Sequence, residues 1–194
     1  MKKHTNYSMA ILGVSLCLTM TAWSQGRDGG QNSLHDLDRM NRLSSVSSQF
    51  RMHMAHGELQ EAKELLKKEM AAGEEWRYAG RAAKVYYELG EYADAMKYFD
   101  IHFSTQPKHD RPSFGRAVLE AKALLYRSAA AGKAPDWTRL SDLDRTINPA
   151  HILVFLTKQS ISSYCLRSAR FLLKELPKLG VDHQTIKLIT DSLK

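Results

Sequence analysis

The sequence predicts an all-α fold built of helical hairpins, and three observations favour this class. Apolar residues recur at helical spacing over most of the chain after Leu34. Glycines stand where these periodic stretches stop, as is typical of helix ends. Small and large apolar side chains alternate over residues 76–107, a pattern that favours two closely packed helices. At 194 residues the chain suits one such domain and a short tail.

The first residues of the chain resemble a secretory signal peptide. Lys2 and Lys3 precede a mostly apolar run over residues 9–23, and Ala22 and Ser24 are small residues at the positions that a signal peptidase inspects. We therefore expect residues 1–24 to be removed near Ser24 and the protein to be periplasmic or secreted. The mature chain would then have no transmembrane segment. An uncleaved membrane anchor is the alternative, although the run is shorter than the ~20 apolar residues of a comfortable span.

The two cysteines and the net charge limit what the exported protein can be. Leu16 stands before Cys17, where a bacterial lipoprotein signal has a small residue, so lipidation is not expected. The mature chain keeps only Cys165, which forms no internal disulfide and falls on an apolar stripe typical of a buried, inert thiol. It also keeps 26 of the 28 basic residues against 21 acidic ones, a net charge of +5. For an exported protein this charge favours acidic peptides or protein surfaces as partners, and not nucleic acid.

The mature chain divides into a short leader and a helical domain. Residues 25–33 are polar and rich in glycine, which predicts a flexible leader. The domain is expected over residues 34–194. Its first helix should run to about His56, and its second should cover residues 58–71, with glutamates early and lysines late as the helix dipole favours.

Residues 76–107 predict one complete helical hairpin. Gly90 ends the first helix, Tyr92 begins the second, and Pro107 stops the second. The small residues that let the two backbones approach are Ala79, Ala82, Ala83 and Ala95, and the large residues beside them are Tyr86 and Phe99.

The hairpin is related to an earlier one by an internal repeat. GELQEAKELL from Gly57 aligns with GEYADAMKYF from Gly90, an offset of 33 residues that also relates Ala62 to Ala95. The pattern resembles the tetratricopeptide repeat, whose unit is about 34 residues long. The clearest units cover residues 43–73 and 76–107. The resemblance implies a right-handed α-α superhelix, a solenoid of helical hairpins that binds other proteins and does no chemistry.

Beyond Pro107 the match fades, although the helical pattern continues. We expect helices over residues 113–131 and 136–147, and a short buried helix at HILVFL from His151, for which a strand is the alternative. One amphipathic helix should cover residues 160–176, and a last helix, capped by Asp182, should end at Leu193. The prediction totals about nine helices, in four hairpins and a final cap.

No motif in the chain predicts catalysis or a cofactor. The sequence has no G-x-S-x-G elbow, no phosphate-binding P-loop and no H-E-x-x-H zinc motif. His53 and His56 lie three residues apart on a helix and could share a metal ion, but further ligands are not apparent nearby. We therefore predict no catalytic residue, no metal and no cofactor.

The resemblance also implies a set of partner-binding residues. In tetratricopeptide proteins the first helix of each unit lines a concave groove, and the matching positions here are Arg51, Arg77, Gly80, Lys84 and Tyr87. The cations would select acidic segments or a free C-terminal carboxylate, and Tyr87 would offer an aromatic platform. Solvated charges on an exposed helix are the alternative interpretation.

Together these features predict a non-catalytic scaffold or adaptor of the cell envelope that binds a peptide or partner helix in a basic groove. An assembly or secretion accessory subunit of an envelope complex is one alternative. A helical metal carrier or enzyme, or a basic surface that adheres to anionic membranes or polysaccharides, is another.

Overall fold

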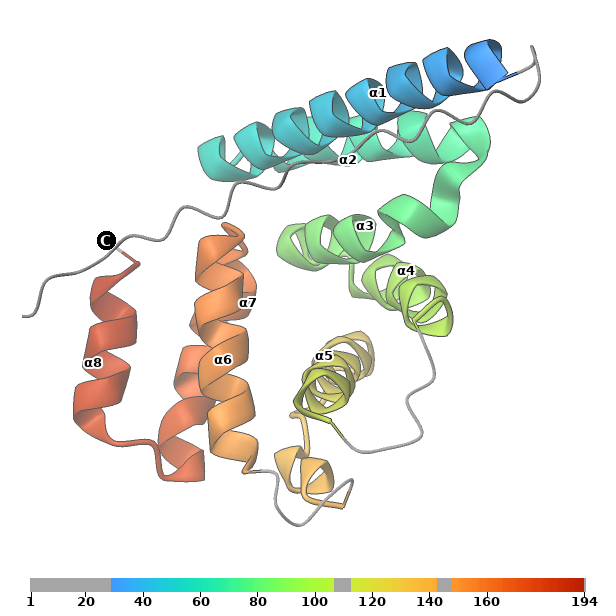
Figure 1. The fold of residues 1–194 in the computed structure, drawn as a ribbon. Coiled ribbons are helices and arrows are strands. Elements are labelled where there is room, and N and C mark those ends of the chain that lie inside the picture. Colours follow the sequence, from blue (N-terminus) through green and yellow to red (C-terminus); the bar gives the residue numbers. More distant parts are fainter. Residues whose placement is uncertain (1–28, 107–112, 143–147, 194) are drawn as a thin grey trace, which may run out of the picture. The chain divides into compact units, whose positions relative to one another are not determined.

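The computed structural model describes residues 29–106, 113–142 and 148–193 (Figure 1). The predicted signal peptide lies outside these residues, as does Pro107. The chain divides into two units between Arg39 and Met40. The described part of the first unit is the beginning of helix α1, which starts at Gly29, within the segment predicted as a flexible leader. The second unit, from Met40 onward, holds the other described residues.

The all-α class is confirmed, since the described residues form helices and no strand. Residues 149–162, which include HILVFL, form a helix, so the strand alternative is wrong. The α-helices are α1 (Gly29–His56), α2 (Leu59–Glu69), α3 (Glu75–Leu89), α4 (Tyr92–Ser104), α5 (Phe114–Ala130), α6 (Pro149–Ser162), α7 (Leu166–Glu175) and α8 (His183–Asp191). Short π and 3-10 turns follow α2, α5 and α7, at Met70–Glu74, Trp137–Leu140 and Leu176–Leu179.

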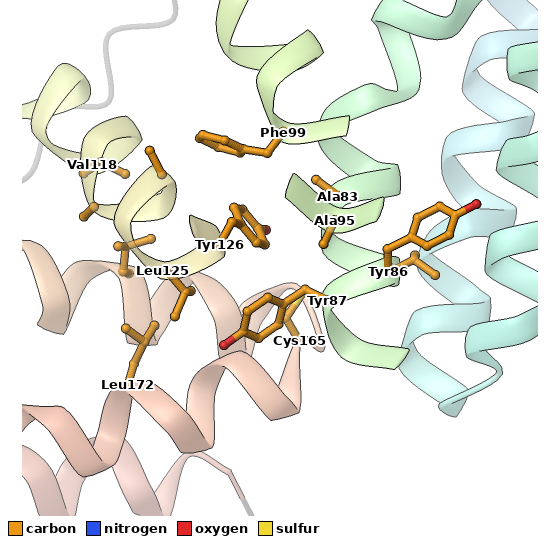
Figure 2. Packing of buried hydrophobic residues seen from close by; sticks show 14 of the residues in the cluster. Ala83, Tyr86, Tyr87, Ala95, Phe99, Val118, Leu125, Tyr126, Cys165 and Leu172 are labelled. Atoms are coloured by element: carbon orange, nitrogen blue, oxygen red, sulfur yellow. The ribbon is translucent and has the colours of Figure 1, made fainter. Parts of the chain in front are cut away.

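The predicted hairpin of α3 and α4 is present. Its small alanines are fully buried, and Tyr86 stacks on Tyr98 with ring centroids 5.1 Å apart. Phe99 of α4 and Tyr126 of α5 pack with centroids 4.9 Å apart (Figure 2). Gly90 has a φ of 87°, and a β-carbon there would lie 2.5 Å from Arg167 Nη1. The backbone conformation therefore favours glycine at this position, while the Arg167 guanidinium is the end of a flexible side chain that could shift.

Because α3 and α4 meet through alanines, a larger side chain should separate them. Ala83→Leu should lower the free energy of unfolding by about 1–3 kcal/mol through overpacking. The Ala83 side chain is buried in the core cluster, and the three further carbons of leucine must displace neighbours in a close-packed interior. Chemical denaturation of the variant and the wild type would measure the change, and equal midpoints and slopes would contradict this packing.

The 33-residue repeat corresponds to a repeated turn. Gly57 and Gly90 both have positive φ, 74° and 87°, and each is followed by a new helix two residues later. In each turn the residue after the glycine donates its N–H to a carbonyl five residues back, Glu58 to His53 and Glu91 to Tyr86. This is the Schellman arrangement of a helix end.

A third hairpin, α6 with α7, uses the same turn without a glycine. Tyr164 has a φ of 57°, its N–H donates to Ile161 O at 2.9 Å, and Cys165 N–H donates to Ser160 O at 2.8 Å. Ala169 is then fully buried four residues after Cys165, as Ala95 is four residues after Glu91. The prediction of one helix over residues 160–176 is therefore wrong, because the chain reverses at Tyr164.

The connection between α5 and α6 differs from a helical hairpin. Asp136 caps a short 3-10 turn by accepting from Thr138 N–H, and Trp137 is buried. Of the helix expected over residues 136–147, the described residues show only the 3-10 turn Trp137–Leu140. Residues 143–147 lie outside the described residues. Trp137 Nε1–H donates to Glu175 Oε2 at 3.2 Å, which joins this turn to α7. At the C-terminal end Asp182 caps α8 as predicted.

Glu88 connects α3 to α7 across the fold. Its buried carboxylate accepts from Arg167 N–H at 2.6 Å, from Ser168 N–H at 2.9 Å and from Ser168 Oγ–H at 2.7 Å. The N-cap position of α7 is Cys165, whose side chain makes no capping bond. Glu88 therefore satisfies the exposed N–H groups at the start of α7 and adds a negative charge that the helix dipole favours.

Candidate functional site

A cleft of about 580 Å³ lies between α1, α3 and the turn that joins α6 to α7. Each element reaches it for a local reason. The α1 and α3 residues recur at helical spacing on one side of their helices, and the others come from the end of α6 and the turn after it, where Tyr164 has a left-handed conformation. The lining residues are Ser47, Phe50, Arg51, Met54, Arg81, Lys84, Gln159, Ser162, Ser163 and Tyr164.

Three cations, Arg51, Arg81 and Lys84, line the cleft, and no acidic residue is among its lining residues. Arg81 is held in place because its Nη2–H donates to Ser47 Oγ at 2.8 Å and its guanidinium lies 5.8 Å from the Phe50 ring centroid. Burial lowers the pKa of Arg81, and the charge of Arg51 lowers it further. The guanidinium stays protonated at physiological pH, so the cleft carries a concentrated positive charge.

The cleft cations have no acidic partner among the described residues, unlike several basic residues elsewhere. Lys63 pairs with Glu91 at 2.6 Å, Arg42 with Glu69 at 2.7 Å and Lys178 with Glu175 at 2.6 Å. Within the part of the chain that the structure describes, Arg51, Arg81 and Lys84 form no ion pair. A ligand with negative charge would therefore meet these cations without first breaking a salt bridge.

Apolar surface lies beside the charges. Phe50 and Met54 form part of the cleft lining on α1, and Tyr164 presents a largely exposed ring from the turn. A non-glycine residue with positive φ is uncommon and costs of order 1–3 kcal/mol. Here that conformation directs an aromatic side chain to the cleft, where a glycine would present none.

A smaller recess of about 20 Å³ adjoins the cleft, with Lys84, Gln159 and Ser163 lining both. Lys122 of α5 and Cys165 also line the recess. Burial lowers the pKa of Lys122 to about 8, and the charge of Lys84 contributes to the same shift. Burial raises the pKa of the Cys165 thiol to about 12, so this thiol is protonated at neutral pH.

The structure brings together two of the five residues predicted to bind a partner. Arg51 and Lys84 line the cleft, as expected of neighbouring first helices. Gly80 faces α4, where an added β-carbon would lie 3.0 Å from His102 Nδ1. Tyr87 is 2% exposed and packs edge-on against Tyr92 and Tyr126. Arg77 lies 4.8 Å from the ring centroid of Trp76 and is not among the cleft residues.

Sequence reasoning missed Arg81 and the turn residues as part of the site. The four- and three-residue spacings of Arg77, Arg81 and Lys84 place these residues on one side of the helix, which is a signal that could have identified Arg81. No local signal identifies Gln159 or Tyr164, because their place in the cleft depends on how α6 and α7 pack against α3.

The histidines considered as metal ligands, His53 and His56, do not belong to a cluster of metal ligands in the described residues. His53 Nδ1 lies 2.7 Å from Glu58 Oε2 across the turn between α1 and α2. In the described ranges, three or more His, Cys, Asp or Glu side chains do not gather into a group that could hold a metal ion. None of the described helices is both long and apolar enough to cross a membrane.

Comparison of the chain with models of protein families, with curated proteins and with solved structures finds no match. The interpretation of the site therefore depends on its own geometry and charge.

Proposed function

We propose that residues 34–194 form a tetratricopeptide-like solenoid, a right-handed α-α superhelix that acts as a non-catalytic scaffold. In this proposal the cleft between α1, α3 and the α6–α7 turn binds an acidic peptide or partner helix. The observation that carries the proposal is the set of three cations, Arg51, Arg81 and Lys84, that share the cleft without an acidic partner among the described residues.

The repeated turn supports the solenoid part of the proposal. Three hairpins, α1–α2, α3–α4 and α6–α7, reverse through the same pair of hydrogen bonds around a residue with positive φ. In each, an alanine four residues after the turn is fully buried: Ala62, Ala95 and Ala169. Recurrence of one supersecondary unit is the defining property of repeat proteins. The contact of α3 with α7 through Glu88 departs from strict neighbour-to-neighbour packing and would close the array on itself.

The size and chemistry of the cleft support a peptide ligand. Its volume, about 580 Å³, falls within the ~300–1,000 Å³ range of ligand-binding pockets. The exposed ring of Tyr164 offers apolar contact for affinity above the nearly buried Phe50 and Met54, while the cations give orientation and a faster association with acidic partners. Both acidic side chains and a C-terminal carboxylate would satisfy these charges. Export to the periplasm or the cell exterior, if residues 1–24 act as a signal, would make envelope proteins the source of such partners.

One observation favours a second candidate, the accessory subunit of an envelope complex. Phe114 and Phe155 form an edge-to-face pair with centroids 5.1 Å apart, and both are largely exposed. Exposed aromatic pairs on a soluble domain often belong to protein interfaces. A permanent partner on this surface would place the scaffold in an assembly and leave the cleft available.

The proposed binding is tested by reversing cleft charges. The probe is a fluorescein-labelled peptide of alternating acidic and apolar residues, with its affinity measured by fluorescence anisotropy. Arg51→Glu, Lys84→Glu should weaken binding by at least about tenfold, since attraction becomes repulsion at two positions. The control Lys133→Glu, Lys187→Glu makes the same change in net charge at exposed residues away from the cleft. Equal affinities for the two double variants would contradict the proposal.

A further inference from the structure

Lys122 occupies an unusual position for a lysine. Its side chain is half-buried and lines the recess together with apolar residues, which are Leu125, Tyr126 and Leu156. Lys84 lines the same recess from α3, so two ammonium groups share a small, partly apolar space. Apolar surroundings and a like charge are the two conditions that favour the neutral, nucleophilic form of an amine.

Neighbouring groups do little to oppose this shift, because burial and Lys84 are its two largest causes and Cys165, the last of the three, acts in the other direction. The Cys165 thiol is protonated at neutral pH because burial raises its pKa to about 12. The charge of Glu88 acts on Cys165, whose pKa it raises, and its carboxylate accepts from the start of α7 and from the Ser168 hydroxyl. His102 on α4 has a pKa lowered by burial and by the charges of Lys122 and Lys84, which favours its neutral form. With a pKa of about 8, Lys122 has a larger fraction of free amine near neutral pH than an exposed lysine has.

The recess lies next to the cationic cleft, since Lys84, Gln159 and Ser163 line both. Its volume of about 20 Å³ holds roughly one water molecule, so it admits a carbonyl group and little more. The rest of a ligand must stay in the cleft, beside Arg51 and Arg81. A molecule that fits both spaces is a small carbonyl compound with a negative charge next to the carbonyl.

We propose that Lys122 is a carbonyl-reactive amine that captures small anionic aldehydes or 2-oxo acids from the cleft. The amine nitrogen adds to the carbonyl carbon to give a carbinolamine, which loses water to form an imine. One C=N bond is formed, one C=O bond is broken, and the oxygen leaves as water. The step needs no oxidant or reductant. The carbonyl compound would use the same cleft as the proposed peptide, but its reaction at Lys122 is measured without any peptide.

The test uses glyoxylate as the probe, with cyanoborohydride to reduce the imine irreversibly. The purified protein is labelled at pH 7.5, digested at acidic residues, and the N-carboxymethyl products are quantified by mass spectrometry. Lys133, an exposed lysine after α5, is the reference in the same molecule. Lys122 should be labelled at least about tenfold faster than Lys133, because its neutral fraction is far larger than that of an exposed lysine. Equal rates at the two lysines would overturn the proposal.

Two further measurements distinguish reaction in the folded recess from ordinary reactivity of a lysine. In concentrated urea the ratio of the Lys122 labelling rate to the Lys133 labelling rate should fall to about one, because the recess is lost. A ratio that stays high in urea would overturn the structural explanation. Propionaldehyde, which is neutral, should give a smaller ratio than glyoxylate, and an equal or larger ratio would overturn the preference for anions. Lys84→Met should lower the ratio several-fold with glyoxylate, since it removes both the attraction of the cleft and the like charge beside Lys122.

Discussion

Glu88→Ala should lower the free energy of unfolding by about 3 kcal/mol, one of the largest effects of any single substitution in this protein. The Glu88 side chain is buried, and its carboxylate accepts three hydrogen bonds from residues of α7 that lie 79 and 80 positions later in the chain. Truncation leaves the N–H groups of Arg167 and Ser168 buried or half-buried without an acceptor, and it removes the contact between α3 and α7. Urea denaturation would measure the loss.

Two controls define the origin of this effect. Glu88→Gln keeps one acceptor oxygen in the same place, so it should cost less than the alanine variant. Glu64→Ala removes an exposed carboxylate that pairs only with Lys67 at 2.8 Å, and its effect should stay within about 0.5 kcal/mol. If Glu88→Ala were as mild as Glu64→Ala, the carboxylate would not hold α7 in the folded protein.

Phe99→Ala should destabilise the protein by about 3–5 kcal/mol, because it opens a cavity where three helices meet. Phe99 is 2% exposed and contacts the rings of Tyr126 and Phe103, with centroid distances of 4.9 Å and 5.9 Å. Figure 2 shows it between α4 and α5. Phe114→Ala is the matched control, since Phe114 is 52% exposed and leaves no cavity. Thermal unfolding should separate the two variants clearly, and similar melting temperatures would contradict the assigned core.

The hairpin of α3 and α4 could be predicted from sequence because its determinants are local. Gly90 marks the turn, and alanines at helical spacing mark the face on which the helices meet. The same holds for Gly57 and for the caps at Asp136 and Asp182, whose side chains accept from nearby N–H groups. In each case the chemistry that sets the structure lies within a few residues of the chain.

The third hairpin could not be predicted, because its turn lacks the usual signal. Tyr164 takes the place of glycine, and the residues on both sides have apolar spacing that continues through the turn. The pattern therefore favoured one helix over residues 160–176. Its offset from Gly90 is also 74 residues, which is not a multiple of the 33-residue repeat. Tertiary contacts, above all those of Glu88 with Arg167 and Ser168, hold this conformation in place.

The positive charge of the candidate site could be predicted from the sequence, but most of the residues that line it could not. Cations on the first helices indicated a basic groove, and Arg51 and Lys84 do line one cleft. Tyr87 looked suited to ligand contact because it is aromatic and follows Lys84 at helical spacing, yet it faces the core. Whether Tyr87 faces a ligand or the core depends on where α5 and α7 pack. The recess at Lys122 has the same origin, since its walls come from α3, α5, α6 and α7.

The most direct test of the central proposal is to locate a bound acidic peptide by NMR. Backbone amide shifts of the labelled protein would be followed while the alternating acidic peptide is added. The account predicts that the largest changes fall on residues 47–54, 81–84 and 159–164, which line the cleft. These changes should be absent in the Arg51→Glu, Lys84→Glu variant, whose remaining spectrum should match that of the wild type. Changes centred on other residues, or none at saturating peptide, would contradict binding in the cleft.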